Sequence, residues 1–486
     1  MSAVGTHSKG AGGRREASVL LAAGNTRLVS IFGSIDDDGE RWVHYIVDVD
    51  SHEYRLFSEQ VKGSIASVTA AAPGAAWYER ELHDLFGIEV EGHPSLQPLV
   101  FHESWPADIH PRRKGQVGGD YRFLKVQGEG VCEVPVGPVH AGIIEPGHFR
   151  FSVVGDTVLH LELRHFYTHK GIEAHFEGVP VMSGMMLSES VSGDNCFAHA
   201  VAYCQALENA FGVSVPPRGR ALRLIGLELE RMLAHIADVG ALCGDVAFTV
   251  PATYTARLKE ALLQASARVT GTRWWRGVAR PGGVTRELAK EDARALGSAV
   301  AAVAHDFAEL AQMILETPSV LNRFESTGVL SSNVARALGV VGPVARASGL
   351  KADVRRDHPY GRYRTLTLDV PHYSSGDVLA RARIRMDETA MSARLIADAV
   401  ETLPAGAIAA AGPWDGSAEG FSAVESPRGE LLYFARVRDG RIRRCHIKSP
   451  SFQNWPALPL AMPGNIIADF PLINKSFNLS YSGCDR

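Results

Sequence analysis

The sequence predicts an α+β fold in two parts: a small α+β domain, then a mainly helical domain with a small β-rich flank. First, two β-rich runs, residues 27–34 and 41–49, are separated by a turn-forming segment and predict a hairpin. Second, residues 134–163 alternate apolar and polar side chains in short strand-like pieces. Third, apolar residues recur at helical spacing over residues 196–212, 219–243, 253–271, 285–316 and 376–402.

The domain boundaries follow from changes in composition along the 486 residues, which are enough for two or three domains. Residues 1–17 are small, polar and basic and predict a disordered tail. The first domain spans residues 18–111 and includes a short charged helix at 77–86. A Gly- and charge-rich linker at 112–125 leads to the second domain, 126–486. There Pro216 and Pro217 precede one long helix, and Thr285 is a candidate cap of another.

Composition excludes several functional classes. With 45% apolar and 21% charged residues and a net charge of −4, the chain is not a general nucleic-acid binder. The sequence contains no run of about 18 apolar residues, so it predicts no helix that spans a membrane. No dinucleotide-binding or phosphate-binding glycine motif supports NADH binding by this chain. The six cysteines are scattered without a CxxC pair, which argues against a disulfide scaffold and against a zinc or iron–sulfur site.

Residues 77–94, WYERELHDLFGIEVEGHP, concentrate charge on the short helix. On composition alone, Glu79, Arg80, Glu81 and Asp84 are typical of a solvated helix face. The pattern as a whole, however, resembles the signature of the 30-kDa subunit of respiratory complex I and of its relatives in membrane-bound hydrogenases. That resemblance implies a docking role without a cofactor, in which the charged helix contributes ion pairs to an interface.

The second domain opens with GPVHAGIIEPGHFRF, residues 137–151. This loop resembles the N-terminal loop of group 4 nickel–iron hydrogenase large subunits and, more loosely, that of the 49-kDa subunit of complex I. The resemblance implies a proton-relay role for Glu145, which would then be buried and face a cavity. It also places His140 and His148 at a quinone cavity. The alternative is that Glu145 is a loop carboxylate exposed to water.

The segment FYTHKGIEAHFEG, residues 166–178, resembles the H-R-G-x-E element of the same family. Lys170 stands where the family has arginine, so a two-pronged contact would become a point-charge contact. Glu173 matches the family glutamate. We expect this stretch to be structural and to brace the interface with a partner that carries an iron–sulfur cluster.

Two motifs resemble the nickel-ligand motifs of the family but lack their four cysteines. In residues 188–216 the ligand positions hold Ser192 and Asn195, and in residues 476–486 they hold Ser480 and Gly483. Serine, asparagine and glycine cannot replace the soft thiolates that hold nickel, so the sequence predicts no nickel site.

Two cysteines follow these positions by one residue. Cys196 and Cys484 could bind zinc together with His199, but their spacing gives no support, and ordinary buried thiols are favoured. A further arginine, Arg428, lies in a segment that resembles the family's E-A-P-R-G-E element. The resemblance implies that it projects into the old metal cavity, where it could stabilise an anion. Alternatively, it is salt-bridged to its neighbours Glu425 and Glu430.

The resemblance runs from about residue 25 to the end and identifies the chain as similar to group 4 hydrogenase large subunits of the formate hydrogenlyase type, with complex I 30-kDa-like and 49-kDa-like parts fused. Two functions remain open. In the first, the chain belongs to an oxidoreductase and passes electrons from a 4Fe–4S cluster in a small partner subunit to a quinone or another acceptor. Complex I has a tyrosine near the first ligand motif; here Asp194, His199 or Arg428 would have to substitute.

In the second, the chain is a non-catalytic docking subunit, and a working hydrogenase is a distant third. We expect no cofactor bound directly by this chain. The implied partners are the iron–sulfur small subunit and membrane-embedded subunits, and the implied location is peripheral, on the cytoplasmic face of the membrane. A cavity lined by converging polar groups would favour the oxidoreductase function. A cavity filled by side chains would favour the docking function.

Overall fold

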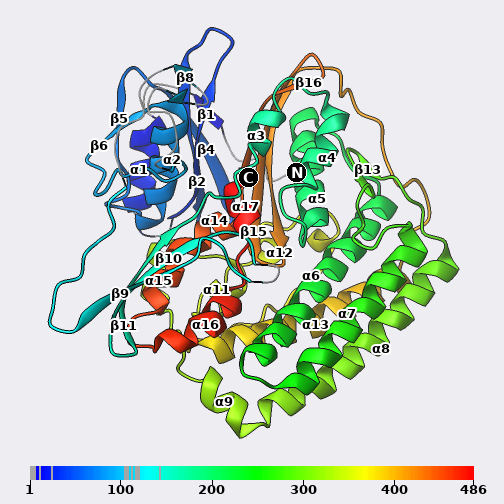
Figure 1. Ribbon diagram of the computed structural model, residues 1–486. Coiled ribbons are helices and arrows are strands. Elements are labelled where there is room, and N and C mark those ends of the chain that lie inside the picture. The colour runs from blue at the N-terminus through cyan, green and yellow to red at the C-terminus, as the bar shows by residue number, and fades with distance from the viewer. Residues whose placement is uncertain are drawn as a thin grey trace.

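The computed structural model describes residues 7–9, 13–22, 24, 26–102, 109–110, 113–114, 121–141 and 144–486. A small N-terminal domain lies against one side of a larger assembly of sheets and long helices, as predicted (Figure 1). The C-terminus lies where the two parts meet. Among the described residues, none of the helices is both long and apolar enough to cross a membrane.

The N-terminal domain is built on a four-stranded sheet in the order β1 (His7–Lys9), β4 (Glu53–Gln60), β3 (Arg41–Val49) and β2 (Thr26–Ile35). The predicted hairpin is confirmed, because β2 and β3 pair antiparallel. Helix α1 (Gly13–Ala22) packs on β4 and β3, and α2 (Ala76–Phe86) packs on β2. A disordered tail over residues 1–17 is therefore wrong for the residues described there, since β1 and α1 extend the domain toward the N-terminus.

Two pairs of short strands follow the four-stranded sheet along the chain. β5 (Ser64–Ala66) pairs with β6 (Glu89–Glu91), and β7 (Ile109–His110) with β8 (Arg113–Lys114). Half of the predicted linker at 112–125, namely residue 112 and residues 115–120, lies outside the described residues.

Two three-stranded sheets form the β-rich part of the second domain. The first contains β9 (Val131–Val136), β10 (His148–Val154) and β11 (Thr157–Arg164). The second contains β14 (Ala418–Ser426), β15 (Gly429–Arg438) and β16 (Arg441–Lys448). Helix α5 (Cys196–Phe211) packs on β14 and β15, so the first ligand-like motif lies beside the hairpin that carries Arg428.

Four long helices form a bundle beside these sheets (Figure 1). They are α6 (Pro217–Asp245), α7 (Thr249–Thr270), α8 (Lys290–Leu315) and α13 (Val378–Glu401), and each packs on two of the others. The predicted helices are confirmed, but α8 begins at Lys290 instead of being capped by Thr285, whose hydroxyl donates to Gly277 O (2.6 Å). At Gly240 a Cβ atom would lie 1.9 Å from Thr255 Oγ1, so glycine permits the close approach of α6 and α7.

Shorter elements connect the bundle and sheets. They are α3 (Ile172–His175), α4 (Gly184–Ser188), β12 (Ala279–Arg280), β13 (Gly283–Val284), α9 (Pro318–Phe324), α10 (Ser332–Ala337), α11 (Gly342–Ala347), α12 (Val354–Asp357), α14 (Pro450–Asn454), α15 (Leu458–Ala461), α16 (Phe470–Phe477) and α17 (Tyr481–Asp485).

The two domains share one continuous apolar core and a set of buried polar contacts. Arg27 of β2 binds Glu430 through its two terminal guanidinium nitrogens (2.7 and 2.8 Å). The same carboxylate accepts from Tyr54 Oη and Lys448 Nζ, both at 2.7 Å. His358 Nε2 lies 3.0 Å from Asp48 Oδ1, which ties the second domain to β3.

The charges of α2 point inward, so the solvated helix face expected from composition is wrong. Glu79 and Asp84 are buried; Glu79 accepts from Val68 N (2.6 Å), and Asp84 accepts from the backbone N–H groups of residues 99 and 100. Arg80 donates to the carbonyls of residues 97 and 98. Glu81 pairs with Arg486 at the C-terminus, so this charge joins the two domains of one chain.

Candidate functional site

Four segments that are far apart in the sequence meet at one place in the second domain. Ser192 Oγ and Ser480 Oγ, from the two ligand-like motifs, lie 3.0 Å apart. Ser480 also caps α17 by accepting from Gly483 N (2.9 Å), which fixes the second motif. Glu145 Oε2, from the loop before β10, accepts from Ser482 N (2.8 Å). The ligand-like motifs and the Glu145 loop therefore converge.

Arg428 supplies the fourth segment, the turn between β14 and β15, and pairs with Asp194. Its Nε also donates to Asn478 O at 2.5 Å. Although burial opposes the charge, the Arg428 guanidinium and the Ser192 hydroxyl hold the pKa of Asp194 below its usual range. The alternative of a salt bridge from Arg428 to Glu425 or Glu430 is wrong, because these carboxylates bind other arginines.

Three buried polar atoms at this place have no hydrogen-bond partner among the described residues. They are His199 Nε2, Asn195 Oδ1 and Arg428 Nη1. The other ring nitrogen of His199 is 2.8 Å from Tyr433 Oη. Burial lowers the pKa of His199 to about 3, so the ring is neutral at physiological pH. Unsatisfied buried donors and acceptors leave the cluster able to hydrogen-bond water or a small ligand.

The loop before β10 is closed by its own histidines. His140 Nε2–H donates to Gly147 O (2.7 Å), and His148 Nδ1–H donates to Gly137 O (3.3 Å). Burial lowers the pKa of His148, and its Nε2 has no partner among the described residues. Glu145 is half-buried, which lies between the buried position that the resemblance implies and the alternative of a loop carboxylate exposed to water.

Lys170 and Glu173 hold neighbouring parts of the chain in place through hydrogen bonds and an ion pair. Lys170 Nζ donates to the carbonyls of Ser190 and Val191, each at 2.8 Å, and so holds the chain just before Ser192. Glu173 binds Arg444 Nη1 (2.7 Å) and accepts from Ile447 N (2.9 Å). The stretch braces contacts within the chain.

Cys196 and Cys484, which follow the ligand-like positions by one residue, are buried. Cys196 Sγ donates to Trp274 O (3.4 Å), and burial raises the pKa of both Cys196 and Cys484. Within the described ranges, no three histidine, cysteine or acidic side chains gather as a set that could hold a metal ion.

Sequence reasoning missed Glu230, a buried acid on α6. Its two carboxylate oxygens accept from Phe197 N (2.7 Å) and Ala198 N (2.9 Å), at the start of α5. Burial, with the Asp194 charge adding to it, raises the pKa of Glu230 to about 8, so the acid is mostly neutral at pH 7. The available signal was the run E-L-E-R at 228–231, which places charges in an otherwise apolar helix.

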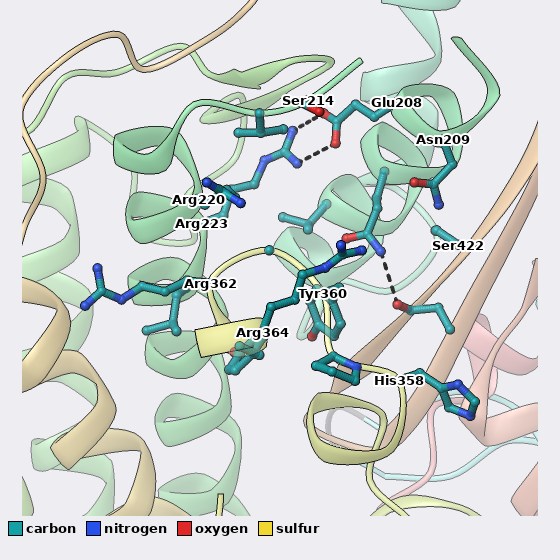
Figure 2. Close-up of a pocket in the computed structure, with 18 of the residues that line it drawn as sticks. Glu208, Asn209, Ser214, Arg220, Arg223, His358, Tyr360, Arg362, Arg364 and Ser422 are labelled. Atoms are coloured by element: carbon teal, nitrogen blue, oxygen red, sulfur yellow. Dashed lines mark hydrogen bonds and ion pairs between the residues drawn. The ribbon is translucent and has the colours of Figure 1, made fainter. Parts of the chain in front are cut away.

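A larger pocket than any space at this cluster lies elsewhere in the described part of the chain. It has a volume of about 380 Å³ and is formed by α5, the start of α6, residues 358–364 and β14 (Figure 2). None of Glu145, Asp194, His199 and Arg428 lines it. The polar groups predicted for a cavity converge largely on one another instead.

Comparisons with known proteins match both domains. Residues 18–122 match the family described as respiratory-chain NADH dehydrogenase, 30 Kd subunit, and residues 245–414 and 411–486 match the 49 Kd subunit. Formate hydrogenlyase subunit 5 of Escherichia coli is 31% identical over 476 residues, covering 93% of this chain and 81% of the relative.

NADH-quinone oxidoreductase subunit 4 of Thermus thermophilus is 30% identical to this chain. The alignment covers 73% of this chain and 94% of the relative. Among solved structures, a chain of the membrane-bound sulfane sulfur reductase, an archaeal respiratory membrane complex, has the same fold. It gives a TM-score of 0.69 at 24% identity and covers 74% of this chain and 99% of that one.

Proposed function

Because the chain belongs to the family of fused 30-kDa and 49-kDa subunits that is homologous to peripheral subunits of complex I and membrane-bound hydrogenases, we propose that it works in such an oxidoreductase. In this proposal it passes electrons from a 4Fe–4S cluster of a partner small subunit to a quinone or another organic acceptor. Membrane-embedded subunits hold the assembly at the cytoplasmic face.

The observation that carries this proposal is the convergence of Ser192, Asp194, Arg428 and Ser480 beside unsatisfied buried polar atoms. Arg428 is buried, whereas the Asp194 side chain is 44% exposed, so the pair reaches from the interior toward the surface. Buried polar atoms without partners are costly and are rare in folded proteins. Their retention at one spot supports a bound ligand.

The residues present do not fit nickel. The Ser192 and Ser480 hydroxyls share a hydrogen bond of 3.0 Å, Asn195 offers an amide, and Gly483 has no side chain. Hard oxygen and amide groups do not replace four thiolates. The proposed electron transfer therefore does not run through a metal held by these residues.

The chain's own residues suit an acceptor that gains negative charge and then protons. Arg428 can hold an anionic oxygen, because its Nη1 has no partner among the described residues. His199 is neutral and can donate or accept one hydrogen bond through Nε2. Glu230 is a protonated acid near pH 7, and Glu145 lies nearer the surface, so the two carboxyls are candidate proton carriers.

One observation favours a second function, that of a non-catalytic docking subunit. Asp194 and Arg428 neutralise each other, and the two serines bond to each other, so much of the old cavity is filled. In that case the variants below leave electron transfer unchanged.

The test uses the assembled complex with its native partners. The partner cluster is reduced, and its reoxidation by a soluble quinone is followed by absorbance or electron paramagnetic resonance. Arg428→Gln should slow reoxidation about tenfold or more, since one charge-assisted contact is lost. Arg428→Lys should retain part of the rate. Arg394→Gln on the exposed face of α13 removes the same charge away from the site and is the matched control.

Equal rates in wild type, Arg428→Gln and the control would reject the redox role of this cluster and favour the docking function. A slow Arg428→Gln complex that still contains its full iron content would support the proposal. Such a result separates a lost contact from a lost partner.

A further inference from the structure

Tyr433 and His199 form a hydrogen-bonded pair between β15 and α5. Both side chains are fully buried. The Tyr433 hydroxyl oxygen lies 2.8 Å from His199 Nδ1, and the two rings meet edge to face with their centroids 5.7 Å apart. Within the described part of the chain, this hydroxyl has no other hydrogen-bond partner.

The proton of the Tyr433 hydroxyl fixes the direction of this hydrogen bond. Burial raises the pKa of Tyr433 well above its usual value, so the phenol keeps its proton at physiological pH. A buried hydroxyl proton without an acceptor is costly, and among the described residues His199 Nδ1 is the one acceptor within hydrogen-bond distance. Tyr433 is therefore the donor, and Nδ1 is the acceptor.

A donating Tyr433 determines where the imidazole of His199 carries its own proton. Burial lowers the pKa of His199 to about 3, so the ring is neutral and holds a single N–H. Because Nδ1 accepts, that N–H is at Nε2. Nε2 is itself buried and lacks a partner among the described residues. At the cluster, His199 is thus an unsatisfied donor.

This donor belongs to the same cluster as Arg428. His199 N donates to Asn195 O (3.2 Å), so the histidine lies one helical turn after a ligand-like position. The charges of Asp194 and Arg428 both act on the His199 ring. Arg428 Nη1 is a second buried donor without a partner in the described ranges. Two such N–H groups suit an oxygen that accepts hydrogen bonds, either a carbonyl or an anionic oxygen.

From this geometry we propose that Tyr433 is a positioning residue, which holds His199 as an Nε2–H donor so that His199 and Arg428 together bind a carbonyl or anionic oxygen of the acceptor molecule. A molecule of the same shape whose polar groups are only donors does not fit. The Asp194 side chain is 44% exposed, so solvent reaches the cluster on that side. The ligand class rests on the proposed redox function, whereas the tautomer of His199 does not depend on it.

Nitrogen-15 NMR of the histidine rings in the full-length chain measures the tautomer. The His199 signals are assigned by their contacts with the Tyr433 ring and by their loss in His199→Gln. We expect a protonated Nε2 and an unprotonated Nδ1 in wild type. Tyr433→Phe removes the donor to Nδ1, so a population protonated at Nδ1 should appear.

Tyr203→Phe is the matched control. Tyr203 is as fully buried as Tyr433, and its ring lies 6.2 Å from the Tyr433 ring, but its hydroxyl donates to Val181 O (2.7 Å). This variant should leave the His199 signals unchanged. A wild-type His199 protonated at Nδ1 would overturn the proposal. So would a tautomer ratio that is the same in Tyr433→Phe, Tyr203→Phe and wild type.

Two probes built on the same ring test the ligand class. Duroquinone carries two carbonyl acceptors, and 2,3,5,6-tetramethyl-1,4-phenylenediamine carries two amino groups in their place. Titration of the full-length chain with duroquinone should shift the Nε2 signal of His199, and the diamine should not. No shift with duroquinone, or equal shifts with both probes, would reject the assigned ligand class.

The assembled complex gives the kinetic readout. Tyr433→Phe should raise the KM for duroquinone about 3- to 10-fold with a smaller change in kcat, because one hydrogen bond to the bound acceptor is weakened. An unchanged KM would count against the positioning role. If Arg428→Gln reoxidises the partner cluster at the wild-type rate, the redox function fails, yet the His199 tautomer in the isolated chain remains a separate result.

Discussion

Replacing Glu430 by glutamine should destabilise the protein far more than the same change at a surface ion pair. The Glu430 carboxylate is buried and accepts four hydrogen bonds, two from Arg27 and one each from Tyr54 and Lys448. Glutamine removes the charge and turns an NH₂ group toward donors. Removing one partner of a buried ion pair costs about 3–5 kcal/mol.

Glu53→Gln is the matched control, because Glu53 pairs with Arg55 at 2.8 Å but its side chain is 39% exposed. Exposed pairs contribute about 0.2–1 kcal/mol. Urea unfolding of both variants at pH 7, followed by tryptophan fluorescence, measures the difference in free energy of unfolding. Equal losses in the two variants would refute the reasoning that Glu430 joins the domains.

The pH dependence gives a second check on the same residue. Burial alone would raise the pKa of Glu430, but Arg27 and Lys448 hold it well below its usual range. Its contribution is therefore present above the unfolded pKa of about 4.3 and is lost as pH falls below that value. The stability gap between wild type and Glu430→Gln should narrow on acidification below about pH 4. A gap that widens there would contradict the assignment.

Three further predictions concern other buried contacts. The pKa of Glu230 is raised to about 8, so its stabilising effect is complete below about pH 4.3 and is lost as pH rises through 8. Between about pH 4.3 and pH 8, the free energy of unfolding should therefore decline less steeply with pH in Glu230→Gln than in wild type. Urea unfolding at several pH values measures this slope, and equal slopes in the two proteins would contradict the prediction. Gly240→Ala should cost about 1–3 kcal/mol in thermal unfolding, because the new Cβ meets Thr255; a neutral effect would show that α6 and α7 can separate freely. Arg486→Ala should cost about 3–5 kcal/mol by leaving Glu81 buried without its partner, and limited proteolysis should then release the N-terminal domain more readily than in wild type.

The long helices could be predicted because each buries one apolar face, which leaves a repeat of about 3.6 residues in the sequence. Their ends were less certain. Thr285 is a good capping residue by type, yet its hydroxyl holds a loop by donating to Gly277 O, and α8 starts five residues later. Local sequence does not show which backbone group a hydroxyl will meet.

The charges of α2 could not be placed from composition. Glu81 meets Arg486, a residue 405 positions away, and the partners of Glu79 and Asp84 come from loops without regular patterns. A charged helix is usually solvated, so only the partners reveal that this one is buried.

The site was predicted in part. The resemblance identified Ser192 and Ser480 as ligand-like positions, and in the structure their hydroxyl oxygens are 3.0 Å apart. The pairing of Arg428 with Asp194 was not predicted, because two glutamates closer in sequence were equally good partners by charge. The pocket of about 380 Å³ could not be predicted from the sequence, because its lining residues come from separate segments that share no motif.

The most direct test of the account is the nickel, iron and quinone content of the complex purified with its native partners. We expect iron from the partner cluster and bound quinone or a related acceptor, with no nickel. Nickel at one atom per chain would contradict it, because Ser192, Asn195, Ser480 and Gly483 would then have to form a metal site that their chemistry does not support.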